Sequence, residues 1–323
     1  MRYDLPDWDG AVAALSEANA IAIACHVNPD GDAFGSLLAA SLGLRKLGKT
    51  TYPTWGTTPA QVPASYVFLP GLDSLVQPGD LPPVDIFLAL DCGAVDRLGE
   101  VEPVVARTAT TVNVDHHRGN DNFGTFNLVV PTASSTAELM TSLLRDLGVE
   151  LDLEIATCLY TGIVTDTGRF QYTNSSPETL RLAADLLTFG VPAAEIAGEV
   201  FDSSPFGYLK LVGRVLDRAR LLQESGFVYS WIEQQDLQET GVTMEETEKV
   251  IDLIRGTRAA DVAGLFKEQP GGGFRVSLRS KGPRTVDGIA RDKGGGGHHL
   301  AAGFSTDNVE ETVAFIVSAL QQQ

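Results

Sequence analysis

Three apolar, strand-like runs that end in acidic and imidazole side chains constrain the fold of this chain most strongly. The runs are "IAIACHVNPDGD", "DIFLALDCG" and "TVNVDHHRGN". Helical periodicity lies between and after them, as in "FGSLLAASLGLRKLG" and "LDLEIATCLYTGIVTD". Alternating strands and helices predict an α/β fold with a mostly parallel sheet and helices on both faces. Ligands of such sheets bind at the carboxyl ends of the strands, near the point where the strand order reverses.

The length and a change of pattern near Gly190 predict two domains. We expect an N-terminal domain over residues 1–188, a helical linker over 189–212 that continues as "FGYLKLVGRVLDRARLLQ", and a smaller C-terminal α/β domain over 213–323. In the C-terminal domain, "QPGGG" separates two strand-like runs and predicts a hairpin loop, and "EETEKVIDLIRGTR" predicts a helix.

Composition and charge exclude several classes of protein. No apolar run is long enough to span a bilayer, the N-terminus does not resemble an export signal, and three cysteines at unrelated spacings indicate a reducing cytoplasm. A net charge of −18 argues against a protein that coats long nucleic acid. Residues 251–299 nevertheless carry nine basic and five acidic side chains, so we expect this part to bind a small anion.

Two apparent motifs do not fit their context. "GLRKLGKT", residues 43–50, matches a phosphate-binding P-loop, but it follows a helix and precedes a strand, so we interpret Gly48 as a helix stop. An EF-hand beginning at Asp30 would require a glutamate where Ser41 stands. Neither a nucleotide-triphosphate site nor a calcium loop is therefore expected.

The strand ends together predict a metal centre. A single aspartate there is commonly a turn former or helix cap, and a single histidine is commonly structural. Several strands, however, deliver such groups to one edge, and "TDTGRF" adds Asp166 at the end of a helical run. Crowded carboxylates require cations, and nitrogen and oxygen ligands without thiolates suit Mn²⁺ or Mg²⁺. The ligand count allows two ions about 3.5 to 4 Å apart, with a bridging water as the nucleophile.

The run "GGGGHHLAAGF" near the C-terminus predicts an anion site of another kind. Glycines allow backbone N–H groups to approach an anion, Arg279 offers a bidentate fork for phosphate, and Ser280 offers a hydroxyl. A flexible linker is the alternative for the glycines. For His299 a structural role is the favoured interpretation, and Arg258 is a weaker candidate for phosphate contact.

The motifs "HVNPDGDAFGS", "LALDCG", "VDHHRGN" and "TDTGRF" resemble, in order, those of the DHH phosphoesterases. "SLRS" and "GGGGHHLAAGF" resemble the DHH-associated C-terminal domain, which would make residues 1–188 catalytic and 213–323 substrate-binding. The most similar subgroup comprises nano-RNases and pAp phosphatases, including enzymes that degrade cyclic di-AMP and pApA. The resemblance implies a two-metal phosphodiesterase and phosphatase that releases 5′-mononucleotides from these small nucleotides, in a cytoplasmic homodimer.

The resemblance also implies roles for individual residues. One Mn²⁺ would be bound by His26, Asp30 and Asp91. The other would be bound by Asp32, Asp91, His116 and Asp166. His117 would face the scissile phosphate, and Asp115 would orient both His116 and His117. The terminal phosphate or nucleotide of the substrate would be bound by Arg279, Ser280, Gly296, Gly297 and His298.

Other functions remain open at this point. A single-strand 5′-exonuclease of the same superfamily is the main alternative, although the short chain and negative charge disfavour it. A superfamily pyrophosphatase is less expected, because its C-terminal domain lacks the glycine-histidine motif. A nucleotide-binding regulator without turnover would be expected to have lost a ligand, and none is missing here.

Overall fold

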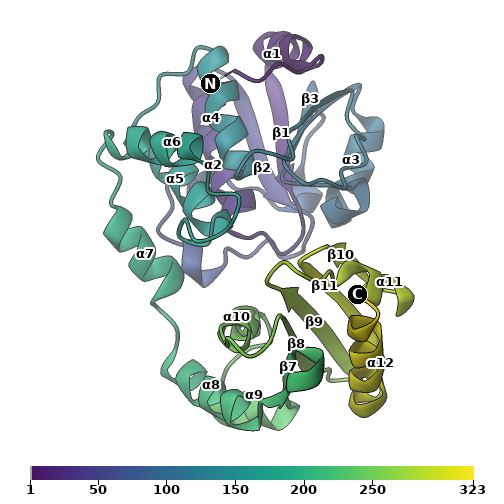
Figure 1. The fold of residues 1–323 in the computed structure, drawn as a ribbon. Coiled ribbons are helices and arrows are strands. Elements are labelled where there is room, and N and C mark those ends of the chain that lie inside the picture. Colours follow the sequence, from purple (N-terminus) through teal and green to yellow (C-terminus); the bar gives the residue numbers. More distant parts are fainter. Residues whose placement is uncertain (1) are drawn as a thin grey trace. The chain divides into compact units, whose positions relative to one another are not determined.

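The computed structural model describes residues 2–323, apart from the side chains of Glu245 and His298. The chain forms two compact units, the first reaching Ser203 and the second spanning Ser204–Gln323 (Figure 1). The segment predicted as a linker, residues 189–212, contains α7 (Ala193–Phe201) and the start of α8 (Phe206–Arg218). Helix α7 belongs to the first unit and α8 to the second.

A five-stranded sheet forms the centre of the first unit, in the order β2-β1-β3-β4-β5. Its strands are β1 (Ala20–Cys25), β2 (Thr50–Trp55), β3 (Ile86–Leu90), β4 (Thr110–Asp115) and β5 (Phe126–Val129). All neighbouring strands are parallel. The α/β fold with a parallel sheet is therefore confirmed, and the strand order reverses between β1 and β3.

Side chains alternate along β1 between two buried faces of this sheet. Ile21 and Ile23 contribute to one core and Ala22 and Ala24 to the other. The first core includes α1 (Trp8–Glu17), α2 (Gly31–Lys46), α4 (Thr136–Asp146) and α5 (Leu153–Asp166). The second includes the 3₁₀ segment η4 (Val95–Val101) and α3 (Glu102–Arg107). Helix α6 (Pro177–Leu187) packs on α5, as Figure 1 shows.

Helix α2 settles the P-loop question. The helix ends at Lys46, Gly48 has a φ of +78°, and β2 begins at Thr50. The chain therefore runs from helix to glycine to strand, as predicted, and the motif opens no helix. Its backbone N–H groups bond to Arg45 and Leu44 carbonyls instead of pointing at a ligand.

The second unit has a mixed six-stranded sheet in the order β10-β11-β9-β8-β7-β6. Its strands are β6 (Arg220–Leu222), β7 (Phe227–Ile232), β8 (Val262–Glu268), β9 (Phe274–Ser280), β10 (Gly296–His298) and β11 (Ala301–Thr306). One face packs on α8, α9 (Gln234–Thr240) and α10 (Val250–Arg255), and the other on α11 (Asp287–Asp292) and α12 (Val309–Gln321). The loop at residues 269–273 joins β8 to β9, which confirms the hairpin.

Two helical predictions in this unit were too long. The helical pattern runs to Gln223, but the helix ends at Arg218. Ala219 leaves the helical conformation, and Arg220–Leu222 pairs with β7. The helix predicted from Glu245 to Arg258 is a 3₁₀ turn followed by the short α10. For residues 220–222, pairing with β7 satisfies backbone groups that local periodicity had assigned to a helix. Along residues 2–323, no helix is both long and apolar enough to cross a membrane.

The packing of α2 against α5 yields a stability prediction. A Cβ atom at Gly35 would lie 2.4 Å from the carbonyl oxygen of Cys158, a backbone atom that cannot rotate away. We expect Gly35→Ala to lower the free energy of unfolding by about 1 to 3 kcal/mol through overpacking, measured by urea denaturation. Gly43→Ala in the same helix is the control, because the atoms nearest its Cβ would belong to the side chains of Leu144 and Val149 and not to the backbone. Equal stability of both variants would contradict the prediction.

Candidate functional site

The carboxyl ends of β1, β3 and β4 bring together the side chains predicted to bind metal. In each of three groups, one ligand-type atom per residue lies within 4.8 Å of the others. The groups are His26, Asp30 and Asp91; Asp32, His116 and Asp166; and Asp91, His116 and His117. All seven lie at the edge where the strand order reverses between β1 and β3.

His26 follows β1 directly and is buried. Its Nδ1 lies 2.8 Å from the carbonyl oxygen of Val27, which accepts a hydrogen bond when Nδ1 carries the proton. Nε2 then faces Asp91, 3.6 Å from Oδ2. Fixing one ring nitrogen on a carbonyl and presenting the other to the site is the usual arrangement of a metal-binding histidine.

His116 Nε2 lies among three carboxylates. It is 3.6 Å from Asp91 Oδ1, 3.6 Å from Asp166 Oδ2 and 3.8 Å from Asp32 Oδ2. These atoms come from the ends of β3, β4 and α5 and the first turn of α2. Asp30 caps that same helix, since its Oδ1 accepts hydrogen bonds from the amides of Asp32 and Ala33. Asp30 is thus a helix cap, the common role of a single strand-end aspartate, and it also belongs to a ligand group.

His117 is held by Asp115. Its Nδ1 lies 2.7 Å from Asp115 Oδ1, and Asn120 donates to Asp115 Oδ2 at 2.6 Å. Burial alone would lower the pKa of His117, but the hydrogen bond to Asp115 and the negative charges of Asp91 and Asp115 raise that pKa to about 9. Burial would raise the pKa of Asp115, but the hydrogen bond and charge of His117, together with the hydrogen bond from Asn120, lower that pKa overall, so this carboxyl stays ionised.

The electrostatics of the cluster favour a bound cation. Burial and the neighbouring charge of Asp91 raise the pKa of Asp32 and of Asp166 well above the ordinary range. Without added positive charge, these carboxyls therefore resist ionising together. For Asp91 burial acts in the same sense, but the imidazole of His26, 3.6 Å away, and the charge of His116 lower its pKa. A donor set of carboxylate oxygens and imidazole nitrogens fits hard or borderline divalent cations.

The structure adds supporting residues that sequence reasoning missed. Thr136 donates its hydroxyl to Asp91 and its amide to Asp32. Beyond α5, residues 168–170 all have positive φ, and the chain returns so that Asn174 donates to Asp166 Oδ2 at 3.2 Å. For Thr136, the sequence signal is the Ser135–Glu138 spacing in "SSTAEL", which indicates that a helix starts at this point. Ser135 is indeed the N-cap, whereas the Glu138 carboxylate accepts from Ser134 instead of completing a capping box with Ser135.

The residues predicted to bind phosphate lie in the second unit. Arg279 in β9 pairs with Ala301 in β11, and Ala301 pairs with His298 in β10, so these three positions form one row of the sheet. The His298 side chain lies outside the described residues. Ser280 is buried, and its hydroxyl donates to the carbonyl of Arg284. Contact of Ser280 with a phosphate would need that hydroxyl to rotate.

The glycine run forms β10 in part, rather than a wholly flexible linker. A Cβ at Gly297, whose φ is +138°, would lie 2.5 Å from Ala301 and Ala302 backbone atoms, whereas Gly296 has open space around it. Arg258 is exposed in the turn after α10, beside Thr257, whose carbonyl accepts from the Lys281 side chain. The Nδ1 atom of His299 lies 3.1 Å from Asp287 Oδ2.

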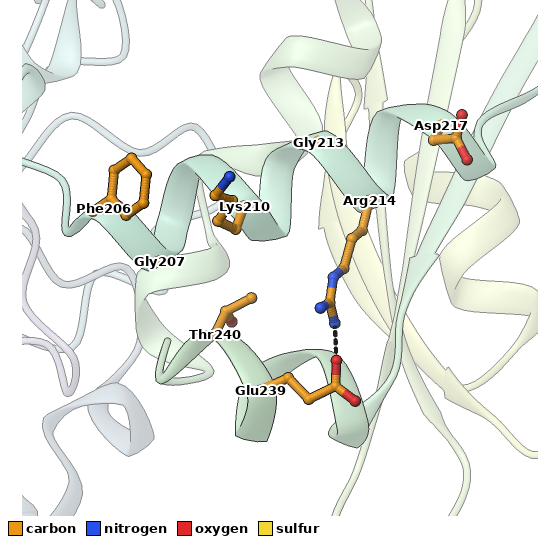
Figure 2. A pocket seen from close by; sticks show the side chains of 8 residues that line it. All are labelled: Phe206, Gly207, Lys210, Gly213, Arg214, Asp217, Glu239 and Thr240. Carbon is orange, nitrogen blue, oxygen red and sulfur yellow. Dashed lines mark ion pairs between the residues drawn. The ribbon is translucent and has the colours of Figure 1, made fainter.

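A separate surface pocket of about 630 Å³ lies between α8 and α9 in the second unit (Figure 2). Its lining includes Phe206, Lys210, Arg214 and Glu239, and an ion pair of 2.7 Å joins the last two. None of the predicted site residues lines it. The Arg214 guanidinium already forms ion pairs with Glu239 and Asp236, so its charge is not available to bind an anion in this pocket.

Comparison with known proteins places this geometry in a family. Residues 20–163 match the N-terminal domain of the DHH family, and residues 224–323 match the DHHA1 domain. A Thermus thermophilus protein named "Bifunctional oligoribonuclease and PAP phosphatase NrnA" is 36% identical over 306 residues. The match covers 94% of this chain and 90% of that relative.

Two solved structures share the fold. An exopolyphosphatase-related protein from Bacteroides fragilis superposes with a TM-score of 0.91 at 25% identity, covering 98% of this chain and 96% of the other. RecJ of Thermus thermophilus in complex with Mn²⁺ gives a TM-score of 0.62 at 17% identity. That match covers 99% of this chain and 55% of RecJ, and the likeness is one of fold.

The Asp115–His117 pair yields a titration prediction. In metal-free protein the His117 imidazole should titrate near pH 9, measured by NMR of the ring nitrogens between pH 5 and 10.5. Asp115→Asn removes the acceptor charge, so the pKa should fall toward the ordinary value of about 6.5. Asp121→Asn, which removes an exposed charge from the same loop, is the control. An unchanged pKa in Asp115→Asn would show that this pair does not set the protonation of His117.

Proposed function

Because this chain belongs to the DHH family, we propose that it is a divalent-metal-dependent phosphoesterase that acts on short nucleotides. One observation carries the proposal: two groups of ligand-type side chains meet at the carboxyl edge of the parallel sheet, with His116 in one group 3.6 Å from Asp91 in the other. Such an edge, rich in carboxylates and imidazoles, suits a two-metal hydrolase.

The donor sets suggest how the two cations are divided. We assign one cation to His26, Asp30 and Asp91. We assign the other to Asp32, His116 and Asp166, with Asp91 shared between the two. Mn²⁺ is the proposed ion, with Mg²⁺ the alternative, because both accept mixed oxygen-rich ligand sets. When bound, the pair would supply positive charge to the phosphate and lower the pKa of an attacking water.

We propose that His117, held by Asp115, contacts the phosphate or its leaving group. Hydrogen bonding of Nδ1 to Asp115 directs Nε2 of His117 away from that carboxylate. His117 Nε2 can therefore donate a hydrogen bond to a phosphate oxygen or a proton to a leaving group. Asn120 holds the second oxygen of Asp115 and so restricts rotation of the pair.

Short nucleotides are the proposed substrates. The Thermus relative is named for oligoribonuclease and PAP phosphatase activity, and we extend both to this chain, together with linear pApA and cyclic di-AMP. A net charge of −18 disfavours long nucleic acid. We assign binding of the terminal phosphate or nucleotide to Arg279, Ser280, Gly296, Gly297, His298 and Arg258. Residues 1–188 as catalytic domain, residues 213–323 as substrate domain, and a cytoplasmic homodimer remain predictions.

The central test is metal-dependent turnover. Protein stripped by chelation should be inactive, and added Mn²⁺ should restore release of AMP from pApA, cyclic di-AMP or short oligoribonucleotides and of phosphate from pAp. Asp91→Asn should lose metal and more than about 100-fold in turnover, because changes beyond the ligands themselves already cost 10 to 100-fold. Asp85→Asn, directly before β3 at the opposite end from Asp91, is the matched control.

The substrate panel distinguishes the alternatives. A 5′-labelled long single strand should be degraded poorly, and a processive ladder would instead support a 5′-exonuclease. Tight nucleotide binding without any product, with Mn²⁺ or Mg²⁺, would overturn the enzyme proposal in favour of a regulator.

The second unit supplies a test of substrate binding. Arg279→Ala should raise KM about tenfold or more for a phosphorylated substrate, because a bidentate guanidinium–phosphate contact is lost. Metal content should stay at the wild-type level. Arg275→Ala removes the same charge from the same strand and is the control. Equal KM values in the two variants would contradict the assigned role.

A further inference from the structure

We infer that Thr136, at the start of α4, is a positioning residue that holds two of the proposed metal-binding carboxylates, Asp32 and Asp91, in their places. The inference rests on the proposed function, since it concerns how the same site is preorganised. Thr136 itself is not assigned to metal or substrate. It acts through the aspartates that it contacts.

The contacts come from one fully buried residue. The Thr136 hydroxyl donates to Asp91 Oδ1 at 2.9 Å, and the Thr136 amide donates to Asp32 Oδ2 at 2.6 Å. The next amide, of Ala137, donates to Asp32 Oδ1 at 2.9 Å. Asp32 is therefore bound through both oxygens by the first turn of an 11-residue helix, whose dipole also stabilises negative charge. Thr136 thus links a carboxylate of α2 to one that follows β3.

Asp91 needs such a restraint more than its neighbours. Its φ is +55°, a left-handed conformation that is uncommon for residues other than glycine, although aspartate tolerates it better than most. Its amide is anchored to the Val114 carbonyl at 3.0 Å. At its carboxylate, the Thr136 hydroxyl lies at 2.9 Å, whereas Nε2 of His26 and of His116 lie at 3.6 Å. The hydroxyl is thus the short contact that fixes the rotation of the Asp91 carboxylate.

Orientation matters because Asp91 is shared. Its Oδ2 faces His26 in one ligand group, and its Oδ1 lies 3.6 Å from His116 in the other. A bridging carboxylate serves both groups only while its plane is held, so rotation about its last bond would weaken both. The two amide contacts to Asp32 come from the backbone, so Thr136→Val and Thr136→Ser both retain them. Substitution therefore isolates the contribution of the hydroxyl to Asp91.

The test compares full-length wild type with Thr136→Val and Thr136→Ser. Calorimetric titration with Mn²⁺ should give about 10-fold or more weaker binding for Thr136→Val, in the range expected for a residue that supports a metal ligand. Thr136→Ser keeps the hydroxyl and should bind within about twofold of wild type. With pApA at saturating Mn²⁺, Thr136→Val should lower kcat while leaving KM nearly unchanged.

Thr141→Val is the matched control. Thr141 lies in the same helix, is buried, and donates its hydroxyl to the carbonyl of Ala137 at 2.8 Å. Thr141→Val makes the same change at a hydroxyl that does not contact a carboxylate, so this variant should keep wild-type Mn²⁺ affinity. Circular dichroism of all variants reports whether each is folded.

The outcomes separate this inference from the proposed function. If wild type binds Mn²⁺ and turns over substrate, but Thr136→Val binds Mn²⁺ equally well with unchanged kcat, the positioning role is wrong and the enzyme proposal stands. A loss in Thr136→Ser as large as in Thr136→Val would also overturn it, because packing rather than the hydroxyl would then be responsible. If wild type neither binds Mn²⁺ nor turns over substrate, the proposed function fails first.

Discussion

The crowding of carboxylates at one edge of a parallel sheet is the constraint on which the rest of the site depends. Asp32, Asp91 and Asp166 all lie within 4 Å of His116 Nε2. Ionised together in a buried setting they would repel one another strongly. Imidazoles, helix amides directed at Asp32 and buried hydroxyls partly stabilise these negative charges. Bound cations would neutralise the charge that remains.

The fold explains why these donors are available there. A parallel sheet sends the carboxyl ends of β1, β3 and β4 to one edge, and the helices that follow the strands begin at that edge. Helix N-termini therefore point toward the same space as the strand-end carboxylates. Asp30 caps α2, and the first turn of α4 binds Asp32. The topology thus supplies both the charges and part of their stabilisation.

The two histidine pairs differ in their surroundings. His116 and His117 follow β4 and lie among aspartates, whereas His298 and His299 follow glycines at the end of β10, in a sheet row that contains Arg279. Within the described residues, the ion pair of His299 is with Asp287. The same dipeptide thus occurs in an acidic cluster in one unit and in a sheet row with Arg279 in the other.

The α/β class, the parallel sheet and the residues at the strand ends could be predicted from the sequence alone, because they follow from apolar periodicity and from the polarity of parallel strands. Tertiary structure alone decided the supporting contacts. Thr136 lies 45 residues from Asp91 and 104 from Asp32, and two of the donors to Asp32 are backbone amides, which no side-chain pattern reveals. Likewise, pairing with β7 turned residues 220–222 from predicted helix into strand. Local pattern fixes which groups reach the edge, and long-range packing fixes how they are held.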